Sequence, residues 1–243
     1  MPGQPPGSRF PVMRILGIVP ARGGSKGIPR KNLADVCGRP LIAWSIEAGE
    51  QLLENGVVAR CIVSTDDEEI AAVARAHGAD VPFLRPAAAA TDTAKALAYV
   101  LHALDTLEPA DGPYDAVMIL QPTSPRRDPA AIAEAVARLA ASDADSLISC
   151  YQEDYINELV MYEDEGDGRI RPRHPNHNKG VRRQEHGPTM VRNGAVYVTR
   201  VPYLRATGQL VCDHPVLLRM EKIDSIDVDT PDDLELLRAV LCR

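Results

Sequence analysis

The 243-residue sequence predicts an α/β fold in which helices cover both faces of a mainly parallel sheet. Short apolar, β-rich runs alternate along the chain with Ala/Leu-rich stretches of helical period. This alternation is typical of βα units that feed a parallel sheet. Because a chain of this length can bury one large core, we expect residues 14–243 to form a single domain with a Rossmann-like three-layer α/β/α architecture.

Apolar runs and helical periodicity place the individual elements. Strands are expected at residues 15–19, 61–65, 81–86, 116–121 and 146–150. Helices are expected at residues 41–53, 68–78, 91–107, 130–141 and 232–241. The run 116–121 is almost entirely apolar, which is typical of a central strand buried on both faces. Regular structure is also expected at 194–199 and 223–228.

Most of the helices carry a start signal. The capping candidates are, in chain order, Asp66 or Asp67, Thr91 or Asp92, Asp128, and Thr230 with Asp233. Prolines stand where three of the helices begin, at Pro40, Pro129 and Pro231. Gly78 is expected to close the second helix, because glycine readily adopts the left-handed conformation found after a helix end.

Residues 153–190 interrupt the alternation. An acidic stretch gives way to a basic one that also carries prolines and histidines. Such a segment is most simply an excursion from the sheet, and we expect an inserted lid, dimerisation arm or loop.

Composition excludes several classes of protein. The formal charge of −7 and the isoelectric point near 5.4 argue against broad electrostatic binding of nucleic acid. Apolar runs are too short for a membrane span, and residues 1–13 are expected to form a disordered leader. The cysteines are odd in number, scattered along the chain and include no CxxC pair. We therefore expect reduced thiols in a cytoplasmic protein, with neither a disulfide scaffold nor a zinc site. They are Cys37, Cys61, Cys150, Cys212 and Cys242.

The loop after the first strand, ARGGSKGIPRKN, is glycine-rich and basic. Its three glycines allow the backbone to approach a bulky anion, and its cations can balance a triphosphate. Those cations are Arg22, Lys26, Arg30 and Lys31. The loop lacks both the GK[ST] ending of a Walker A loop and the GxGxxG spacing. Because ligands of doubly wound sheets bind beyond the carboxyl ends of the strands, we interpret it as a phosphate-binding loop.

The sequence SIDVD brings two carboxylates together. At strand period, Asp227 and Asp229 point to one face and Val228 to the other. Magnesium accepts one or two carboxylates together with phosphate oxygens, so this pair can hold Mg²⁺ opposite the basic loop. The alternative is that Asp229 only helps to start the helix at Thr230, which leaves Asp227 unexplained.

The run IVPARGGSKGIPRKN closely resembles the opening signature of CMP-sialic acid synthetases, a family that includes other CMP-nonulosonic acid synthetases. The resemblance continues through IVSTDDEEIA, FLRP, TDTA, LQPTSP, RNGAVYV and SIDVDTPDDL, and so spans nearly the whole chain after residue 14. It implies the nucleotide-diphospho-sugar transferase type of fold, a homodimer, and EC 2.7.7 chemistry in which CMP passes from CTP to an acidic nine-carbon sugar.

The resemblance also implies roles for individual residues. Nucleotide binding falls to Ala21, Arg22, Gly23, Ser25, Lys26, Asn32 and Arg85, with Asn32 and Arg85 reading cytosine. The catalytic group comprises Arg22, Lys26, Lys31 and Asp227, with Asp227 a candidate general base. Gln121, Ser124 and Arg192 would contact the acceptor sugar. Asp227 and Asp229 would be the Mg²⁺ ligands.

The acceptor pocket departs from the family pattern. The lysine and arginine that hold the sugar carboxylate in bacterial sialic acid enzymes align near Asn157 and Val191, with Arg192 one place displaced. Arg182 and Arg183 can compensate, or can form a solvated basic face. The open alternatives are an enzyme that transfers CMP to Kdo or a phosphonate, and a non-catalytic nucleotide-binding protein. A small-molecule kinase is a third alternative, and the missing GK[ST] motif argues against it.

Overall fold

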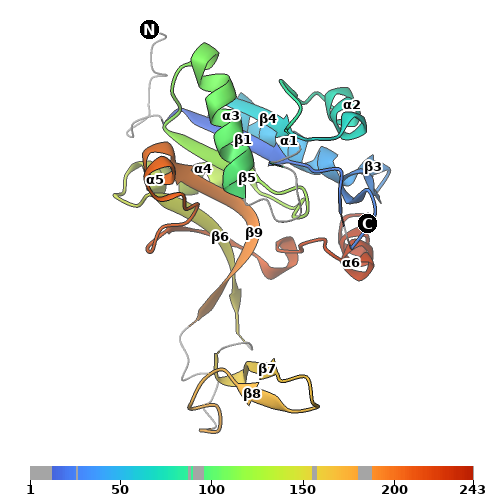
Figure 1. Cartoon of the computed structure of the whole chain (residues 1–243), viewed down its shortest axis with the longest axis vertical. Helices are drawn as coiled ribbons and strands as arrows, with labels where there is room; N and C mark the ends of the chain where they lie inside the picture. The colour runs from blue at the N-terminus through green and yellow to red at the C-terminus, as the bar shows by residue number, and fades with distance from the viewer. Residues whose placement is uncertain are drawn as a thin grey trace.

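A six-stranded sheet in the order β10-β6-β9-β5-β1-β4 forms the centre of the molecule (Figure 1). The computed structural model describes residues 13–25, 27–86, 89, 96–154, 158–179 and 188–242. The sheet strands are β1 (Ile15–Pro20), β4 (Arg60–Ser64), β5 (Ala116–Leu120), β6 (Ser146–Glu153), β9 (Thr189–Arg200) and β10 (Val216–Met220). β9 runs antiparallel to both of its neighbours, and the other pairings are parallel, so the expected mainly parallel sheet is confirmed.

Helices cover both faces of the sheet. α1 (Leu41–Glu54), α2 (Glu68–Ala76) and α4 (Pro129–Ala140) pack in one apolar cluster with Ile15, Met118 and Leu147. α3 (Ala96–Asp111) and α5 (Val201–Thr207) cover the other face over Leu16, Ile18 and Ile119. All five residues of β5 are buried, as expected for the central strand. The three-layer prediction is therefore correct, and no helix in the described part of the chain is long and apolar enough to cross a membrane.

The predicted helix ends are largely confirmed. Asp67 and Asp128 accept hydrogen bonds from backbone amides at the starts of α2 and α4. Thr230 and Asp233 form a reciprocal capping box at the start of α6 (Pro231–Leu241). Gly78 follows α2 with φ of +88°, the conformation that favours glycine. The caps expected at Thr91 and Asp92 lie outside the described residues.

Several elements differ from the expectation. Residues 81–86 form no strand, and the backbone here makes isolated parallel bridges, between Ile62 and Asp80 and between Thr65 and Leu84. Pro82 and Pro86 lack the amide hydrogen that a continuous ladder needs, which explains the interruption. Residues 223–228 form no sheet strand either, because the short 3₁₀ helix η5 (Lys222–Asp224) begins this stretch and Val228 then bonds Thr123 and not a neighbouring strand. α5 and β10 were not anticipated.

The inserted segment leaves the sheet along a two-stranded arm. β6 and β9 remain paired to Glu153 and Thr189, well beyond the sheet body (Figure 1). At the end of the arm, β7 (Tyr162–Asp164) pairs with β8 (Ile170–Pro172), preceded by the 3₁₀ helix η3 (Glu158–Val160). Val160, Tyr162 and Ile170 expose 55%, 41% and 62% of their surface there, so the tip of the arm presents apolar side chains to solvent.

The expectation that all cysteines are reduced is wrong. Cys37 and Cys242 form a disulfide, with Cα atoms 5.3 Å apart and a sequence separation of 205 residues. Helix α6 packs beside the hairpin of β2 (Asp35–Val36) and β3 (Arg39–Pro40), which brings the two residues together. Spacing along the chain gave no sign of this contact because it arises only in the tertiary structure. Cys61, Cys150 and Cys212 are free.

Candidate active site

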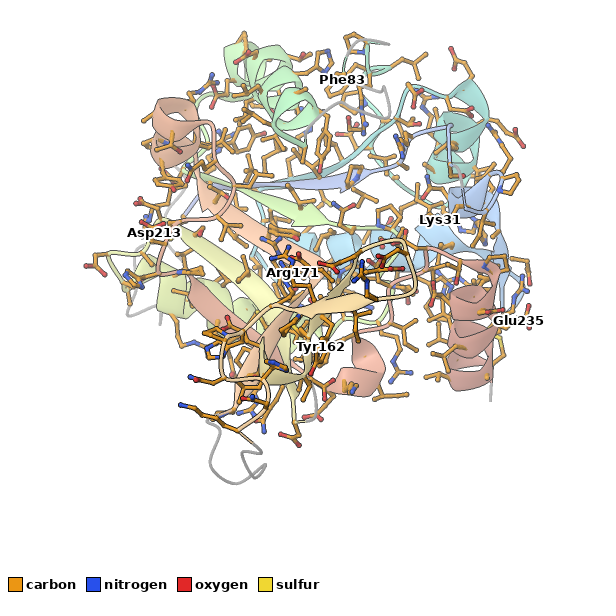
Figure 2. The ribbon with its side chains drawn as sticks, turned by 60° about the horizontal axis from the view of Figure 1, so that its bottom comes forward. Lys31, Phe83, Tyr162, Arg171, Asp213 and Glu235 are labelled. Atoms are coloured by element: carbon orange, nitrogen blue, oxygen red, sulfur yellow. A yellow bond between two sulfur atoms is a disulfide. The ribbon has the colours of Figure 1, made fainter. Side chains whose placement is uncertain are left out.

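The candidate site lies where the carboxyl ends of β1, β4 and β5 meet, as the parallel register of these strands requires. The basic loop follows β1, Asp66 and Asp67 follow β4, and the PTSP turn follows β5. The backbone amide of Val228 donates to the carbonyl of Thr123 at 2.8 Å. This bond attaches the aspartate segment, residues 225–229, to the PTSP turn. In Figure 2, Lys31 lies on the side of the molecule that carries α6 and Glu235, opposite Asp213 at the far edge.

The basic loop is held by its own polar groups. Ala21 is buried, and its amide continues the β1–β4 pairing by donating to Ser64. The Gly23 amide donates to Asp66 Oδ1 at 3.0 Å. The Ser25 hydroxyl donates to the Ile28 carbonyl and accepts from the Lys31 amide. Ser25 therefore shapes the turn, although the sequence suggested a phosphate contact for it.

Asn32 is also part of this support. It is 7% exposed and donates through Nδ2 to the Arg22 carbonyl at 3.0 Å. Its side chain thus ties the end of the loop to its beginning. The expected contact with cytosine would use the remaining amide atoms of this side chain.

The cations of the loop take different positions. Arg30, in the left-handed conformation, pairs with Asp67 at 2.5 Å and also with Glu69, away from the aspartate pair. The hydrogen bond from Arg30 lowers the pKa of Asp67 below its usual value. Lys31 instead reaches Asp229, with 2.8 Å between Nζ and Oδ1. Lys26 lies outside the described residues.

Arg85 lies deep at the carboxyl end of β4. It is 6% exposed, and Nε donates to the Ser64 hydroxyl at 3.1 Å while a terminal nitrogen donates to the Ser64 carbonyl. Its guanidinium stacks over the Tyr99 ring of α3, 4.7 Å from the centroid. Burial lowers the pKa of Arg85, and the nearby charge of Arg22 acts in the same direction. Ser64 of β4 and Tyr99 of α3 thus hold the Arg85 guanidinium in place.

The aspartate segment keeps the predicted alternation without being a strand. Val228 is fully buried, and Asp227 and Asp229 are both exposed. Ser124 is also buried, and its hydroxyl lies 3.4 Å from Asp227 Oδ1. Ser124 thus lies against the carboxylate of Asp227, where the sequence suggested a contact with the acceptor.

The basic loop after β1 and the aspartate segment are in close contact. A Cβ atom added at Gly27 would lie 2.2 Å from the Asp229 carbonyl oxygen. Only glycine fits at this position. Together with the Lys31–Asp229 ion pair, this contact fixes the distance between the loop cations and the carboxylates.

The acceptor side is only partly described. Gln121 directly follows β5, and its carbonyl accepts from the Ser124 amide. Arg192 is exposed on β9, with its guanidinium 5.9 Å from the Tyr197 ring centroid. Burial raises the pKa of Tyr197, while the charges of Arg192 and Asp227 act on it in opposite directions. Val191 pairs with Tyr151, and Asn157, Arg182 and Arg183 lie outside the described residues.

Two residues that sequence reasoning missed support the site. Arg127 donates to the Ser45 hydroxyl and to the carbonyls of Gln121 and Ala195. Its guanidinium is enclosed, and burial lowers its pKa to about 9 against the opposing effect of Asp227. Asn193 is buried and bonds both Ser149 and Ser225. Both residues stand in or next to motifs that carry the family resemblance: Arg127 is the second arginine of PTSPRR, and Asn193 is the asparagine of RNGAVYV.

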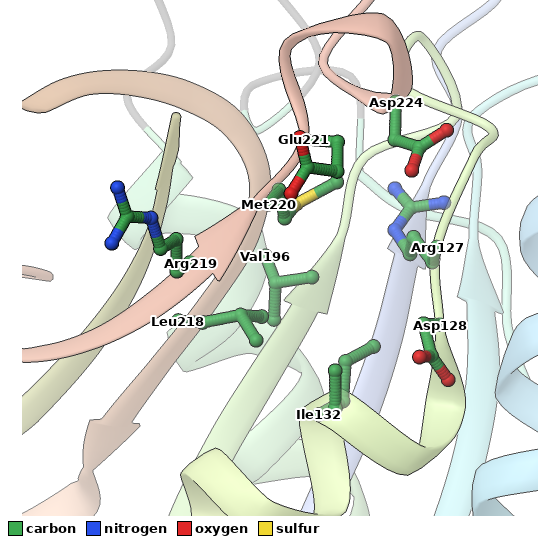
Figure 3. A pocket seen from close by; sticks show the side chains of 10 residues that line it. Arg127, Asp128, Ile132, Val196, Leu218, Arg219, Met220, Glu221 and Asp224 are labelled. Carbon is green, nitrogen blue, oxygen red and sulfur yellow. The ribbon is translucent and has the colours of Figure 1, made fainter. Parts of the chain in front are cut away.

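Arg127 also lines a pocket between α4 and β10 (Figure 3). The floor of the pocket is apolar, formed by Ile132, Val196 and Leu218, and acidic residues line it further out. These floor residues belong to the cluster on the α4 face of the sheet, whereas Arg85 and Tyr99 lie on the α3 face. The pocket is therefore separate from the predicted nucleotide contacts.

Comparison with known proteins identifies the family. The family model described as "Cytidylyltransferase" matches residues 16–204. The chain belongs to the cytidylyltransferase family. CMP-N,N'-diacetyllegionaminic acid synthase of Legionella pneumophila is 33% identical over 240 residues, covering 94% of this chain and 97% of that protein. N-acylneuraminate cytidylyltransferase of Escherichia coli is 42% identical over 123 residues, covering 51% of this chain and 27% of the longer relative.

Solved structures support the fold of this cytidylyltransferase. CMP:2-keto-3-deoxy-manno-octonic acid synthetase complexed with CTP superimposes with a TM-score of 0.66 at 21% identity, covering 94% of this chain and 98% of the other. A 4-diphosphocytidyl-2C-methyl-D-erythritol synthase from Anaerococcus prevotii gives 0.60 at 11% identity, covering 96% and 100%. The resemblance inferred from the motifs is thus confirmed at the level of the family and its fold.

Proposed function

We propose that this cytidylyltransferase transfers CMP from CTP to a hydroxyl of an acidic nonulosonic sugar and releases pyrophosphate. The observation that carries the proposal is the contact between the basic loop and the aspartate segment, where Lys31 Nζ lies 2.8 Å from Asp229 Oδ1. Such a junction offers cations for phosphate oxygens and carboxylates for a divalent ion in one place. The full-length similarity to a CMP-legionaminic acid synthase supports the same class of reaction.

The residues present fit Mg²⁺. Asp227 and Asp229 are both exposed and flank the buried Val228, and hard carboxylate oxygens are the ligands that Mg²⁺ prefers. The described residues contain no cluster of three or more acidic, histidine or cysteine ligands, so phosphate oxygens and water would complete the coordination. When bound, the ion would supply charge stabilisation at the phosphates.

The chain's own residues would then organise the reaction. Lys31 pairs with Asp229, and its flexible side chain can turn to the phosphate oxygens of a bound triphosphate. Arg22, Lys26 and Lys31 would stabilise the negative charge that develops on the phosphates. The acceptor hydroxyl would attack the α-phosphorus in line with the departing pyrophosphate, and Asp227, held by Ser124, would accept its proton. Asn32 and Arg85 would read the cytosine.

The acceptor is proposed as a nine-carbon sugar acid of the N-acylneuraminate or legionaminate class. Its carboxylate needs a cation, and Arg192 is exposed on β9 beside Tyr197. A carboxylate pairs well with a guanidinium because two parallel hydrogen bonds can form. Gln121, at the carboxyl end of β5, would contact the sugar.

We also propose a homodimer in the cytoplasm. The arm of β6 and β9 ends in the exposed apolar residues Val160, Tyr162 and Ile170, which a second copy can cover. The cytoplasm is proposed because CTP is available there. Sedimentation velocity of the wild type and of a Val160→Ser, Ile170→Ser variant tests the dimer, and equal sedimentation of both as dimers would reject this surface.

The function is tested by incubating the protein with CTP, Mg²⁺ and a panel of sugar acids that includes sialic, legionaminic and Kdo acceptors and a phosphonate. Asp229→Ala should reduce pyrophosphate release by about 10² or more, since it removes a charge that acts on the transition state. Asp232→Ala, which removes an exposed carboxylate three residues away, should retain activity. Equal activity of the two variants would refute the metal assignment.

A further inference from the structure

Helix α6 and the aspartate segment share a small apolar cluster that is separate from the two main ones. Its buried members are Ile28, Val36, Leu41, Val228, Leu234 and Leu237. They come from the phosphate loop, the β2–β3 hairpin, α1, the aspartate segment and α6. This cluster packs α6 against the basic loop and the hairpin, and the helix has further attachments at both of its ends.

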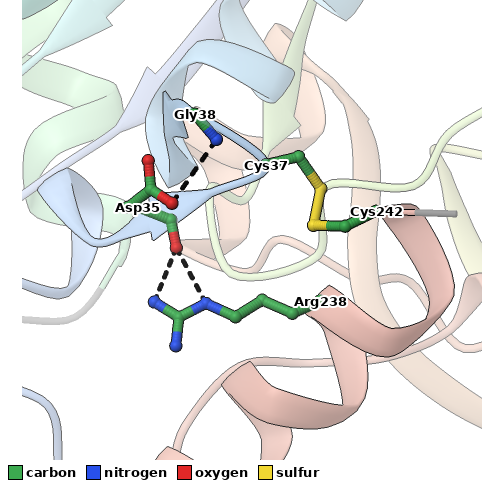
Figure 4. The surroundings of a disulfide bond; sticks show 5 residues. All are labelled: Asp35, Cys37, Gly38, Arg238 and Cys242. Atoms are coloured by element: carbon green, nitrogen blue, oxygen red, sulfur yellow. Dashed lines mark hydrogen bonds between the residues drawn. A yellow bond between two sulfur atoms is a disulfide. The ribbon is translucent and has the colours of Figure 1, made fainter.

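One of these attachments is the hairpin turn that Figure 4 shows. Cys37 and Gly38 join β2 to β3 with φ values of +57° and +77°, the pattern of a two-residue hairpin with left-handed central residues. Cysteine is not a residue that such a turn favours. The side chain of Cys37 is nevertheless used, because its sulfur is bonded to Cys242 at the end of α6. Arg238 adds two hydrogen bonds to the Asp35 carbonyl, at 3.0 and 2.7 Å.

The other end of α6 leads directly into the site. Thr230 caps the helix, and Asp229 precedes it. The Asp229 backbone fits against Gly27, and its carboxylate pairs with Lys31. The disulfide at the C-terminus of α6 and the carboxylates at its N-terminus are therefore connected through a single helix.

We propose that the Cys37–Cys242 disulfide is a redox-sensitive clamp that positions the Asp227–Asp229 segment against the phosphate loop. A dithiol reductant cleaves the sulfur–sulfur bond by thiol–disulfide exchange. Two electrons and two protons pass from the reductant to Cys37 and Cys242, and the reductant itself becomes a disulfide. Cys242 is exposed, so a reductant can reach it. Disulfides that occur in the cytosol are usually transient, and catalytic or redox-sensing, so a reversible bond at this place fits the proposed cytoplasmic location.

The remaining thiols do not compete strongly for this role. Burial raises the pKa of Cys61 to about 12 and also raises that of Cys150, so both carry little thiolate at neutral pH. Burial acts to raise the pKa of Cys212, but hydrogen bonds with Ser146 and with backbone groups lower it overall. This thiol is set apart by its position, because Ser146 begins β6 at the opposite end of the sheet strands from the site.

Hydrogen–deuterium exchange of the full-length protein, oxidised and reduced with dithiothreitol, tests the clamp without relying on activity. Reduction should accelerate amide exchange in α6 and in residues 225–230 by about tenfold, while β1 and β5 exchange as before. The double variant Cys37→Ser, Cys242→Ser should match the reduced wild type and show no response to dithiothreitol. Equal exchange of α6 in both redox states, or alkylation of both cysteines in oxidant-treated protein, would overturn the clamp.

The consequence for the site rests on the proposed function and needs its own readout. Reduction should raise the Mg²⁺ concentration needed for half-maximal pyrophosphate release by about threefold to tenfold. The kcat at saturating Mg²⁺ should change little, because the carboxylates are displaced and not removed. A change in exchange without this shift would refute the link to the site, and absence of CMP transfer in both states would refute the proposed function while leaving the exchange result valid.

Discussion

Substitution of Gly27 by alanine tests the contact on which the site is built. The added Cβ atom would lie 2.2 Å from the Asp229 carbonyl oxygen, and Cβ atoms essentially never approach closer than 3.0 Å. The basic loop and the aspartate segment must then move apart by at least 0.8 Å, the difference between these two distances. The obstacle is a backbone atom, so rotation of a side chain cannot relieve it. Overpacking of this kind costs about 1–3 kcal/mol.

The displacement should affect catalysis more than stability. A shift of about 1 Å in a reacting group reduces rates on the order of 10²-fold. We therefore expect Gly27→Ala to lower kcat/KM for CTP by about that factor and to lower Tm by several degrees, as ΔΔG values of this size do in domains of this length. Thermal unfolding and continuous pyrophosphate release measure both effects.

Gly24→Ala is the matched control for stability. A Cβ atom at Gly24 meets nothing within 4 Å, and the residue does not have a positive φ. Its unfolding free energy should stay within about 0.5 kcal/mol of the wild type. If Gly27→Ala were as stable and as active as the wild type, the proposed contact between the loop and the aspartate segment would be wrong.

Three further changes have defined outcomes. Lys31→Met should raise KM for CTP and lower kcat, with a combined loss of about 10²-fold in kcat/KM; an unchanged value would remove Lys31 from the site. Thr230→Ala should lower the free energy of unfolding by about 1 kcal/mol through loss of the cap, measured by urea denaturation, and an unchanged midpoint would contradict the capping role. Arg30 lowers the pKa of Asp67, so this interaction stabilises the fold above the ordinary pKa of 3.8 and is lost as the pH falls through the lowered value. Asp67→Asn should therefore narrow the difference in unfolding free energy between about pH 7 and acid. An identical pH profile of stability in the variant and the wild type would contradict this role of the ion pair.

The sequence was most informative where local chemistry decides the structure. The caps at Asp67, Asp128 and Thr230 follow from side chains that bond amides within three residues, and such contacts depend little on the rest of the fold. The alternation around Val228 was also predicted correctly, because burial of one residue forces its neighbours outward. Residues 223–228 nevertheless form no strand, since their backbone bonds the PTSP turn and not a neighbouring strand.

The features that escaped prediction all depend on residues distant in the chain. Arg127 donates to the carbonyl of Ala195 on β9 as well as to that of Gln121, and Asn193 links β6 to Ser225 beside the aspartates. The disulfide joins positions 205 residues apart. The contact of Ser124 with Asp227 is also distant in the chain, whereas Ser25 bonds Ile28 and Lys31 within its own loop. The ligand contacts expected for both serines stay predictions.

The central claim is tested most directly by identifying the products formed from CTP. The protein, CTP, Mg²⁺ and a nonulosonic acid such as N-acetylneuraminate or a legionaminate are incubated together, and products are quantified by mass spectrometry. The account predicts equal amounts of pyrophosphate and a CMP-linked sugar acid, formed only when an acidic acceptor is present. CTP binding without any CMP-linked product across the acceptor panel, or release of CDP in place of pyrophosphate, would contradict it.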